Sequence, residues 1–324
     1  MFVPLLIRGN TAAAKSRALS QAKRRYVTAG PLACIGGIHE TAVASPIRAM
    51  GFQMQWILAV LALVSLNAFA SDATLEILAA KERLIFSQSR LLSRSDVEMI
   101  SVAGSAYERR FTRFKAIPIG NLFRGLPIPE LAVVQCNSTD GFSAILDKTR
   151  LLGTDPQVSR AYLAIEDPKS PWPDLAGKTA SAGPFYLVWI NPEASAIGPE
   201  EWPYQIASFH VLSDLHGVFP KIYPAVDAAE SVQNGFKSFR KNCLACHKIN
   251  GEGAASIGPD LNLPMNPTEY FRANGLVALI RDPASVRTWP RRTMRGFSAA
   301  VIPDAELSDL IAYLRHMSFR KDKR

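Results

Sequence analysis

The spacing of apolar residues divides the chain into segments with different expected structures. Residues 73–116 have long side chains with apolar positions at helical spacing, so we predict a helical segment there. After a proline-rich stretch at 117–129, the pattern changes to short apolar runs bounded by turn residues, which predicts strands. The predicted strands are 131–136, 161–165 and 185–190. Helical spacing returns at Ala228 and continues to the end of the chain.

This pattern predicts a two-domain fold, an α+β domain with mixed β structure followed by an all-α domain. Residues 71–220 form the α+β domain, whose role the pattern does not reveal, and we expect a strand and a connecting loop within 199–218. Residues 221–227, which include Pro224, read as a linker. The all-α domain is then 228–324.

The first 70 residues are expected to be a leader and signal peptide. An apolar run from Trp56 to Leu66 has the length of a signal-peptide core and is short for a membrane span. Ala68-Phe69-Ala70 follows it as a small-x-small cleavage site, so we expect cleavage after Ala70. The alternative is an uncleaved membrane anchor. Either way, the rest of the chain is expected outside the cytoplasm.

The net charge of +9 is a poor guide to the partners of this protein. Residues 1–70 contain seven basic residues and one acidic residue, so the remainder of the chain carries only +3. A charge this small gives no reason to expect a phosphate backbone as a partner. We therefore expect no nucleic-acid binding.

The sequence Cys243-Leu244-Ala245-Cys246-His247 is the main candidate for chemistry. Two cysteines at this spacing, followed directly by histidine, predict covalent attachment of one haem with His247 as the proximal iron ligand. A thioredoxin-like redox pair would require a βαβ surround, and a zinc site would usually require a second Cys-x-x-Cys pair. A structural disulfide gives no role to His247.

The flanking residues resemble the class I mono-haem cytochromes c. Gly235-Phe236-Lys237-Ser238-Phe239 resembles the N-terminal helix of that family, and Leu310-Ile311-Ala312-Tyr313-Leu314 resembles its C-terminal helix. The resemblance implies that the two helices cross with Gly235 at the contact. It also implies that Pro259, within Gly258-Pro259-Asp260-Leu261, accepts a hydrogen bond from His247, a partner that orients the imidazole and raises its donor strength.

The sixth iron ligand is expected to be Met294. The resemblance places the axial methionine in a loop before the last helix, and Met294 lies in such a segment, although Arg295 stands where that family commonly has proline. Met265, Met317 and His316 are the other candidates. Trp289 and Arg291 belong to a basic cluster, with Arg281, Arg287 and Arg292, that could pair with haem propionates or dock an acidic partner.

Residues 130–205 also resemble, more weakly, part of the molybdopterin-binding domain of sulfite oxidase-like oxidoreductases. Asp140-Gly141-Phe142 and 183–188 carry this resemblance, which looks truncated. Cys136 is the cysteine that could act as a molybdenum ligand, but cysteine is more often a buried, inert residue. We therefore do not expect a molybdopterin cofactor, and we interpret His210 and His216 as packing or surface residues.

The function predicted from the sequence is electron transfer through one covalent haem c, more as a carrier than as a catalyst. The partners would be a periplasmic redox enzyme, such as a molybdopterin or other dehydrogenase, and a downstream electron acceptor. A membrane is a partner only if the N-terminal segment stays uncleaved. The alternatives are a self-contained oxidoreductase that passes electrons from its N-terminal domain to the haem, and a haem sensor with an open sixth site.

Overall fold

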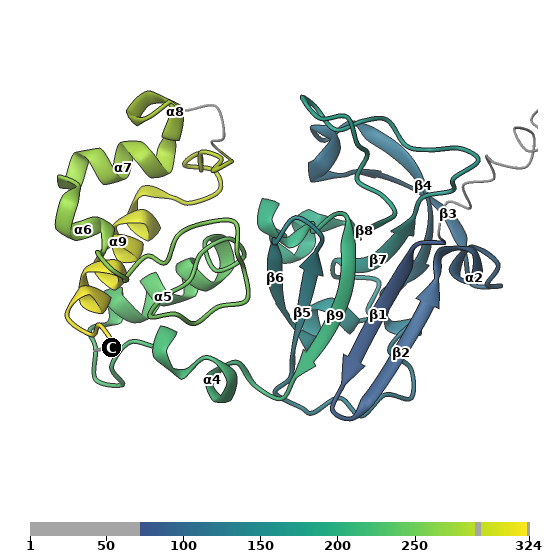
Figure 1. Cartoon of the computed structure of the whole chain (residues 1–324), viewed down its shortest axis with the longest axis horizontal. Helices are drawn as coiled ribbons and strands as arrows, with labels where there is room; N and C mark the ends of the chain where they lie inside the picture. The colour runs from purple at the N-terminus through teal and green to yellow at the C-terminus, as the bar shows by residue number, and fades with distance from the viewer. Residues whose placement is uncertain (1–71, 289–292, 323–324) are drawn as a thin grey trace, which may run out of the picture. The chain divides into compact units, whose positions relative to one another are not determined.

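The strands of this protein form two sheets in the computed structural model, which describes residues 72–288 and 293–322. The five-stranded sheet has the order β2-β1-β9-β5-β6, and the four-stranded sheet has the order β3-β4-β7-β8 (Figure 1). All pairings are antiparallel except that of β1 with β9. The bounds are β1 Thr74–Ala79, β2 Glu82–Ser87, β3 Glu98–Ala103, β4 Phe111–Pro118, β5 Val133–Ser138, β6 Ser143–Asp147, β7 Arg160–Ile165, β8 Phe185–Ile190 and β9 Ile206–Leu212.

The helix predicted for residues 73–116 is wrong, because this segment forms β1 to β4, with the short helices α2 (Gln88–Leu92) and η1 (Ser105–Tyr107) between them. Leu75, Ile77 and Ala79 are buried while their neighbours are more exposed, which is the two-residue period of a strand. The parallel partner of β1 is β9, which lies far away in the sequence. The long-range pairing of β1 therefore overrides the helical spacing of its apolar residues.

The strands predicted at 131–136, 161–165 and 185–190 are present as β5, β7 and β8. The last two are buried on both faces almost along their whole length. Buried residues of both sheets join in one apolar cluster, which explains why these strands read as continuous apolar runs. The segment 199–218 contains β9, between the short helices η4 (Pro199–Glu201) and α4 (Leu215–Val218).

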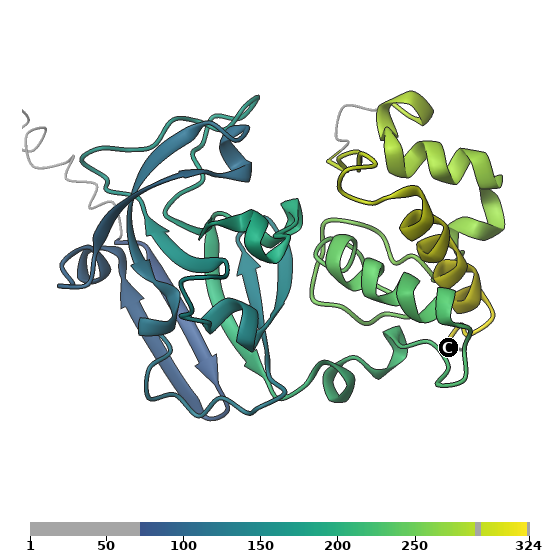
Figure 2. The ribbon, with the colours of Figure 1, turned by 180° about the vertical axis from the view of Figure 1, so that it is seen from behind.

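The C-terminal region is helical, as predicted. It contains α5 (Glu230–Asn242), α6 (Pro267–Tyr270), α7 (Ala273–Arg281), α8 (Pro283–Val286) and α9 (Asp304–Ser318), preceded by the short η5 (Pro220–Ile222). Asp304 and Glu306 stand in the first turn of α9, where negative charge stabilises a helix. Figure 2 shows α5 and α9 packed together from the opposite side.

The contact between α5 and α9 depends on Gly235. A Cβ at this position would overlap the carbonyl oxygen of Asp309 and lie 2.8 Å from the Cβ of Tyr313. Phe236 and Phe239 of α5 also pack against the Tyr313 ring, with centroid distances of 5.6 and 5.2 Å. The structure thus confirms the close helix approach that the resemblance implied for Gly235.

A second apolar cluster lies in the helical region and also includes Val133 of the two-sheet region, with Ile145 and Leu212 packed against it. The two regions belong to one compact unit, Phe69–Arg324. Within the described residues, no helix combines the length and the apolar character needed to cross a bilayer. The predicted signal segment lies outside the described residues.

Candidate functional site: the Cys243–His247 turn

Cys243, Cys246 and His247 lie on one hydrogen-bonded turn at the end of α5. The N–H of Cys243 donates to Phe239 O at 2.9 Å, which continues the helix ladder. The N–H groups of Cys246 and His247 both donate to Cys243 O, at 3.0 and 2.9 Å. This turn brings two sulfurs and one imidazole together in a few residues, as the sequence spacing predicted.

The imidazole of His247 is oriented by the loop that follows. Its Nδ1 lies 2.9 Å from the carbonyl oxygen of Pro259, so Nδ1 carries the proton and Nε2 is left with its lone pair. Gly258 allows this approach, because a Cβ there would lie 2.5 Å from Nδ1 and 2.6 Å from Cε1 of His247. Burial lowers the pKa of His247, which keeps the ring neutral and able to bind a metal ion. The structure therefore confirms the contact expected between His247 and Pro259.

The two cysteines are free thiols in an environment that disfavours a thiolate. Burial raises the pKa of Cys243, and it raises the pKa of Cys246 to about 12. Around Cys246, Glu200 and Asp140 raise the pKa further while Arg295 opposes them. Redox-active Cys-x-x-Cys pairs have lowered thiol pKa values. The turn also follows a helix rather than a β-strand, so the geometry does not match a thioredoxin-like site.

Three buried asparagines hold the loop between His247 and α6 against the end of α9. Asn262 Nδ2 donates to Asn250 Oδ1 at 2.7 Å and to Met317 O at 2.8 Å. Asn266 Nδ2 donates to Asn262 Oδ1 at 2.9 Å and to Leu314 O at 2.8 Å, and Asn250 Nδ2 donates to Arg320 O at 3.0 Å. We call Asn250, Asn262 and Asn266 the asparagine ladder. The ladder was not predicted from the sequence, although three asparagines close to Pro259 were a visible signal.

Replacing Asn262 by leucine is expected to destabilise the protein by about 2–4 kcal/mol. Leucine has a similar volume but removes one of the two donors to the carbonyl of Met317, which keeps the N–H of Arg320, and it takes a hydrogen-bond partner from both neighbouring asparagines. Urea unfolding followed by far-ultraviolet circular dichroism measures the loss. Asn234→Ala in α5 is the control, because Asn234 bonds only an exposed lysine within the described structure, and its effect should stay within about 0.5 kcal/mol. Equal effects of the two variants would contradict the role of the ladder.

The four candidate sixth ligands differ in burial. Met317 is 1% exposed inside the helical core, and His316 Nε2 accepts from the N–H of Ala225 at 3.1 Å. Met265 is 52% exposed. Met294 is partly buried and packs against the second apolar cluster, in an irregular segment ahead of α9. Met294 thus retains the position that the sequence suggested for it, and its role as a ligand remains a prediction.

The segment after Met294 is held in place by α7. Phe297 N–H donates to Ile280 O at 2.9 Å, and Arg281 Nη1 donates to Phe297 O at 2.9 Å and to Ile302 O at 2.6 Å. Arg281 also pairs with Asp304 at the start of α9. This arginine of the predicted basic cluster therefore has a structural role. Trp289 and Arg291, the predicted propionate contacts, and Arg292 lie outside the described residues.

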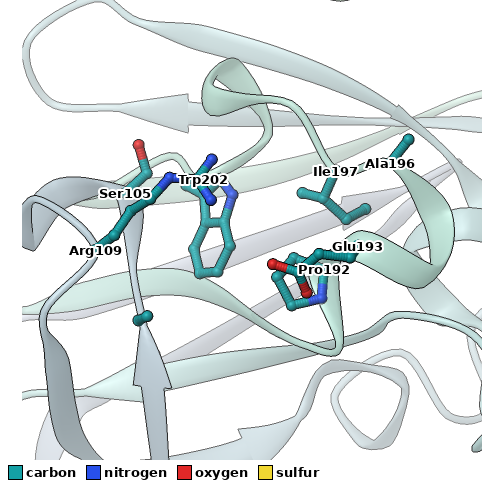
Figure 3. A pocket seen from close by; sticks show the side chains of 8 residues that line it. Ser105, Arg109, Pro192, Glu193, Ala196, Ile197 and Trp202 are labelled. Atoms are coloured by element: carbon teal, nitrogen blue, oxygen red, sulfur yellow. The ribbon is translucent and has the colours of Figure 1, made fainter. Parts of the chain in front are cut away.

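The two-sheet region has a cavity of about 300 Å³ away from Cys136. Figure 3 shows Arg109 and Trp202 on one side of it and Pro192 and Glu193 on the other. Cys136 is fully buried in the apolar core, where burial raises the pKa of its thiol. Among the described residues, no group of three or more His, Cys, Asp or Glu side chains is arranged to hold a metal ion.

His210 and His216, which we expected to be packing or surface residues, make local contacts. His210 Nε2 lies 3.2 Å from Ser208 Oγ, and the His216 ring packs on Tyr223 at a centroid distance of 4.7 Å. Both contacts agree with the interpretation of these residues as packing or surface histidines. The sulfite oxidase-like assignment of this region remains a prediction.

The residues at the Cys243–His247 turn fit a covalently attached haem. They offer two free sulfurs, a neutral imidazole with Nε2 available, and an adjacent apolar cluster that includes Cys243 and Met294. Comparison with known protein families matches residues 232–318 to the family described as Cytochrome c. A search of curated proteins finds no match for the chain. The chain thus contains a cytochrome c domain, which implies covalently bound haem c and electron transfer through it.

Proposed function

We propose that this protein is an exported, periplasmic electron-transfer protein with one haem c, acting as a subunit or electron acceptor of a redox enzyme. The observation that carries the proposal is the bond between His247 Nδ1 and Pro259 O, which leaves Nε2 available beside two free cysteines on the same turn. A histidine that only packs in the core does not require two cysteines at this spacing on the same turn. The combination favours axial ligation of iron.

Different residues of the chain would hold different parts of the cofactor. Bound haem supplies one-electron exchange at its iron. Cys243 and Cys246 would hold the porphyrin through thioethers, and His247 and Met294 would supply the imidazole and thioether ligands of its iron. The helical apolar cluster, against which Cys243 and Met294 pack, would shield the group from water on that side. A thioether opposite histidine favours reduced iron and so a raised reduction potential, which suits a carrier.

Export and partner choice rest on the sequence. The apolar run before Ala68-Phe69-Ala70 supports passage across a membrane. The weak basic excess of residues 71–324 supports a protein partner rather than a nucleic acid. The partners we propose are a periplasmic dehydrogenase as electron donor and a second redox protein as acceptor. Cell fractionation and copurification of the mature protein test both points.

Replacing both Cys243 and Cys246 by serine is expected to abolish covalent haem attachment. Serine hydroxyls do not form the thioethers, so the haem would be extracted by acidified organic solvent. The measurement is haem stain after denaturing electrophoresis of protein made in a host that matures c-type cytochromes. Cys136→Ser is the matched control and should keep its haem, because Cys136 lies in the two-sheet core.

Metal analysis of the purified wild-type protein completes this test. We expect one iron per chain. Wild-type protein without covalent haem would overturn the proposal, and stoichiometric molybdenum would favour the self-contained oxidoreductase instead.

A further inference from the structure

The turn of the β5–β6 hairpin and the first residue of β6, together residues 140–143, contact both segments that present the proximal histidine. Ala245 lies between the two haem-attachment cysteines, and its carbonyl accepts a hydrogen bond from the N–H of Ser143 at 3.0 Å. Ser256 lies three residues before Pro259, and its N–H donates to the carbonyl of Gly141 at 3.0 Å. The hairpin thus forms a hydrogen bond to the Cys243–His247 turn through Ser143 and another to the Pro259 loop through Gly141.

We propose that this hairpin clamps the Cys243–His247 turn to the Pro259 loop, so that the two-sheet region serves as a built-in partner that positions the proximal haem ligand. The inference rests on the proposed function, because it concerns the histidine of that haem site. Gly141 and Ser143 are positioning residues in this proposal, since they act through the backbone of Ala245 and Ser256. This gives the two-sheet region a role in the haem chemistry.

The hairpin is rigid enough to act as a clamp. Its turn is closed by Ser138 N–H donating to Phe142 O at 2.8 Å and by Phe142 N–H donating to the Asp140 carboxylate at 3.0 Å. Ser143 Oγ donates to Asn137 Oδ1 at 2.8 Å, and Asn137 Nδ2 donates to Ser208 Oγ at 3.1 Å. The turn is therefore fixed to β9 in the middle of the five-stranded sheet.

Gly141 is suited to this close contact. Its φ is +92°, a conformation that residues with a side chain rarely adopt. A Cβ at Gly141 would overlap Ser256 Oγ and meet Ile257 Cγ1 at 3.7 Å. A side chain longer than alanine would therefore push the 256–257 segment away from the hairpin. This segment leads directly into Gly258, whose N–H donates to Cys246 O at 2.8 Å.

Charged and apolar contacts flank the clamp. Asp147 at the end of β6 pairs with Arg240 of α5, and Lys241 Nζ donates to Ala196 O at 3.2 Å. Ile145, between these anchors and the turn, packs against the apolar cluster of the helical region. These contacts hold the two-sheet region on α5 and on the turn that follows it. The clamp is therefore part of a larger intramolecular interface.

The first test compares Gly141→Leu with Gly125→Leu in the haem-loaded protein. Gly125 also has a positive φ, +84°, but nothing lies within 4 Å of its Cβ position, so it controls for backbone strain. In Gly141→Leu, the bond from His247 Nδ1 to Pro259 O should lengthen, which weakens the histidine as a donor. We expect a positive shift in reduction potential, altered NMR signals of the proximal histidine, and about tenfold faster hydrogen exchange at Gly258 N–H. Gly125→Leu should leave all three readouts unchanged.

A charge swap provides a second test that does not change the hairpin backbone. Asp147→Arg sets like charges against each other and should shift the same readouts in the same direction, and adding Arg240→Asp should restore them. If Gly141→Leu does not fold, the charge swap alone decides.

Haem-loaded variants that keep the wild-type potential, histidine signals and Gly258 exchange would overturn the clamp while leaving the proposed function intact. Loss of covalent haem from the wild-type protein would instead overturn the proposed function.

Discussion

Gly235→Val is expected to destabilise the haem domain by at least about 3 kcal/mol and to prevent stable folding of its two main helices. The new side chain would overlap the carbonyl oxygen of Asp309 and crowd the Cβ of Tyr313. Neither obstacle is the flexible end of a side chain, so α5 and α9 must move apart. Separation would also expose the contacts of Phe236 and Phe239 with Tyr313. The small gain in helix propensity of valine over glycine does not offset this loss.

Urea unfolding of the haem-loaded protein, followed by far-ultraviolet circular dichroism, measures this effect. The matched control is Gly275→Ala in α7, where the new Cβ would lie 3.6 Å from the Phe271 ring, an ordinary contact distance. This control should leave stability unchanged or raise it by about 0.5–1 kcal/mol, because alanine favours a helix over glycine. A wild-type unfolding midpoint for Gly235→Val would show that the helices do not depend on this close approach.

Met294→Ala is expected to leave the haem attached while lowering its reduction potential by on the order of 0.1 V, within the roughly 0.8 V range that axial ligands control. Cys243, Cys246 and His247 are unchanged in this variant, so attachment persists. Loss of the thioether removes a ligand that favours reduced iron. The vacated position should also admit external ligands such as imidazole. The neighbouring segment is held by Phe297 and Arg281 independently of Met294, so the fold should survive.

Redox titration and absorption spectra with and without imidazole measure the effect of Met294→Ala. Met265→Ala is the control, because Met265 is largely exposed, and it should behave as the wild type. A wild-type potential in Met294→Ala together with a changed potential in Met265→Ala would reverse the assignment of the sixth ligand.

The haem-attachment turn was predictable from the sequence because its geometry is local. Cys243, Cys246 and His247 need only one turn of backbone to come together, and their spacing already specifies that turn. The contact of His247 with Pro259 is almost as local. It was found through the family resemblance, whereas the need for Gly258 beside the imidazole became evident only from the distances.

The strands β7 and β8 were also predictable, because burial on both faces produces continuous apolar runs that are visible in the sequence. The strand β1 was not. Its apolar residues admit a helical reading, and the choice is made by its pairing with β9 from the other end of the region. The edge strand β2 then pairs with β1. A strand that needs a distant partner leaves only a weak local signal.

The sequence by itself indicated the chemistry of this protein: two cysteines and a histidine that we expect to hold one haem, with a methionine ahead of the last helix as the expected distal ligand. The tertiary structure decided how that chemistry is held. The asparagine ladder and the hairpin contact with Ala245 join residues from separate parts of the chain. Hydrogen-bond partners of this kind are chosen by the packing of whole elements, so no local pattern specifies them.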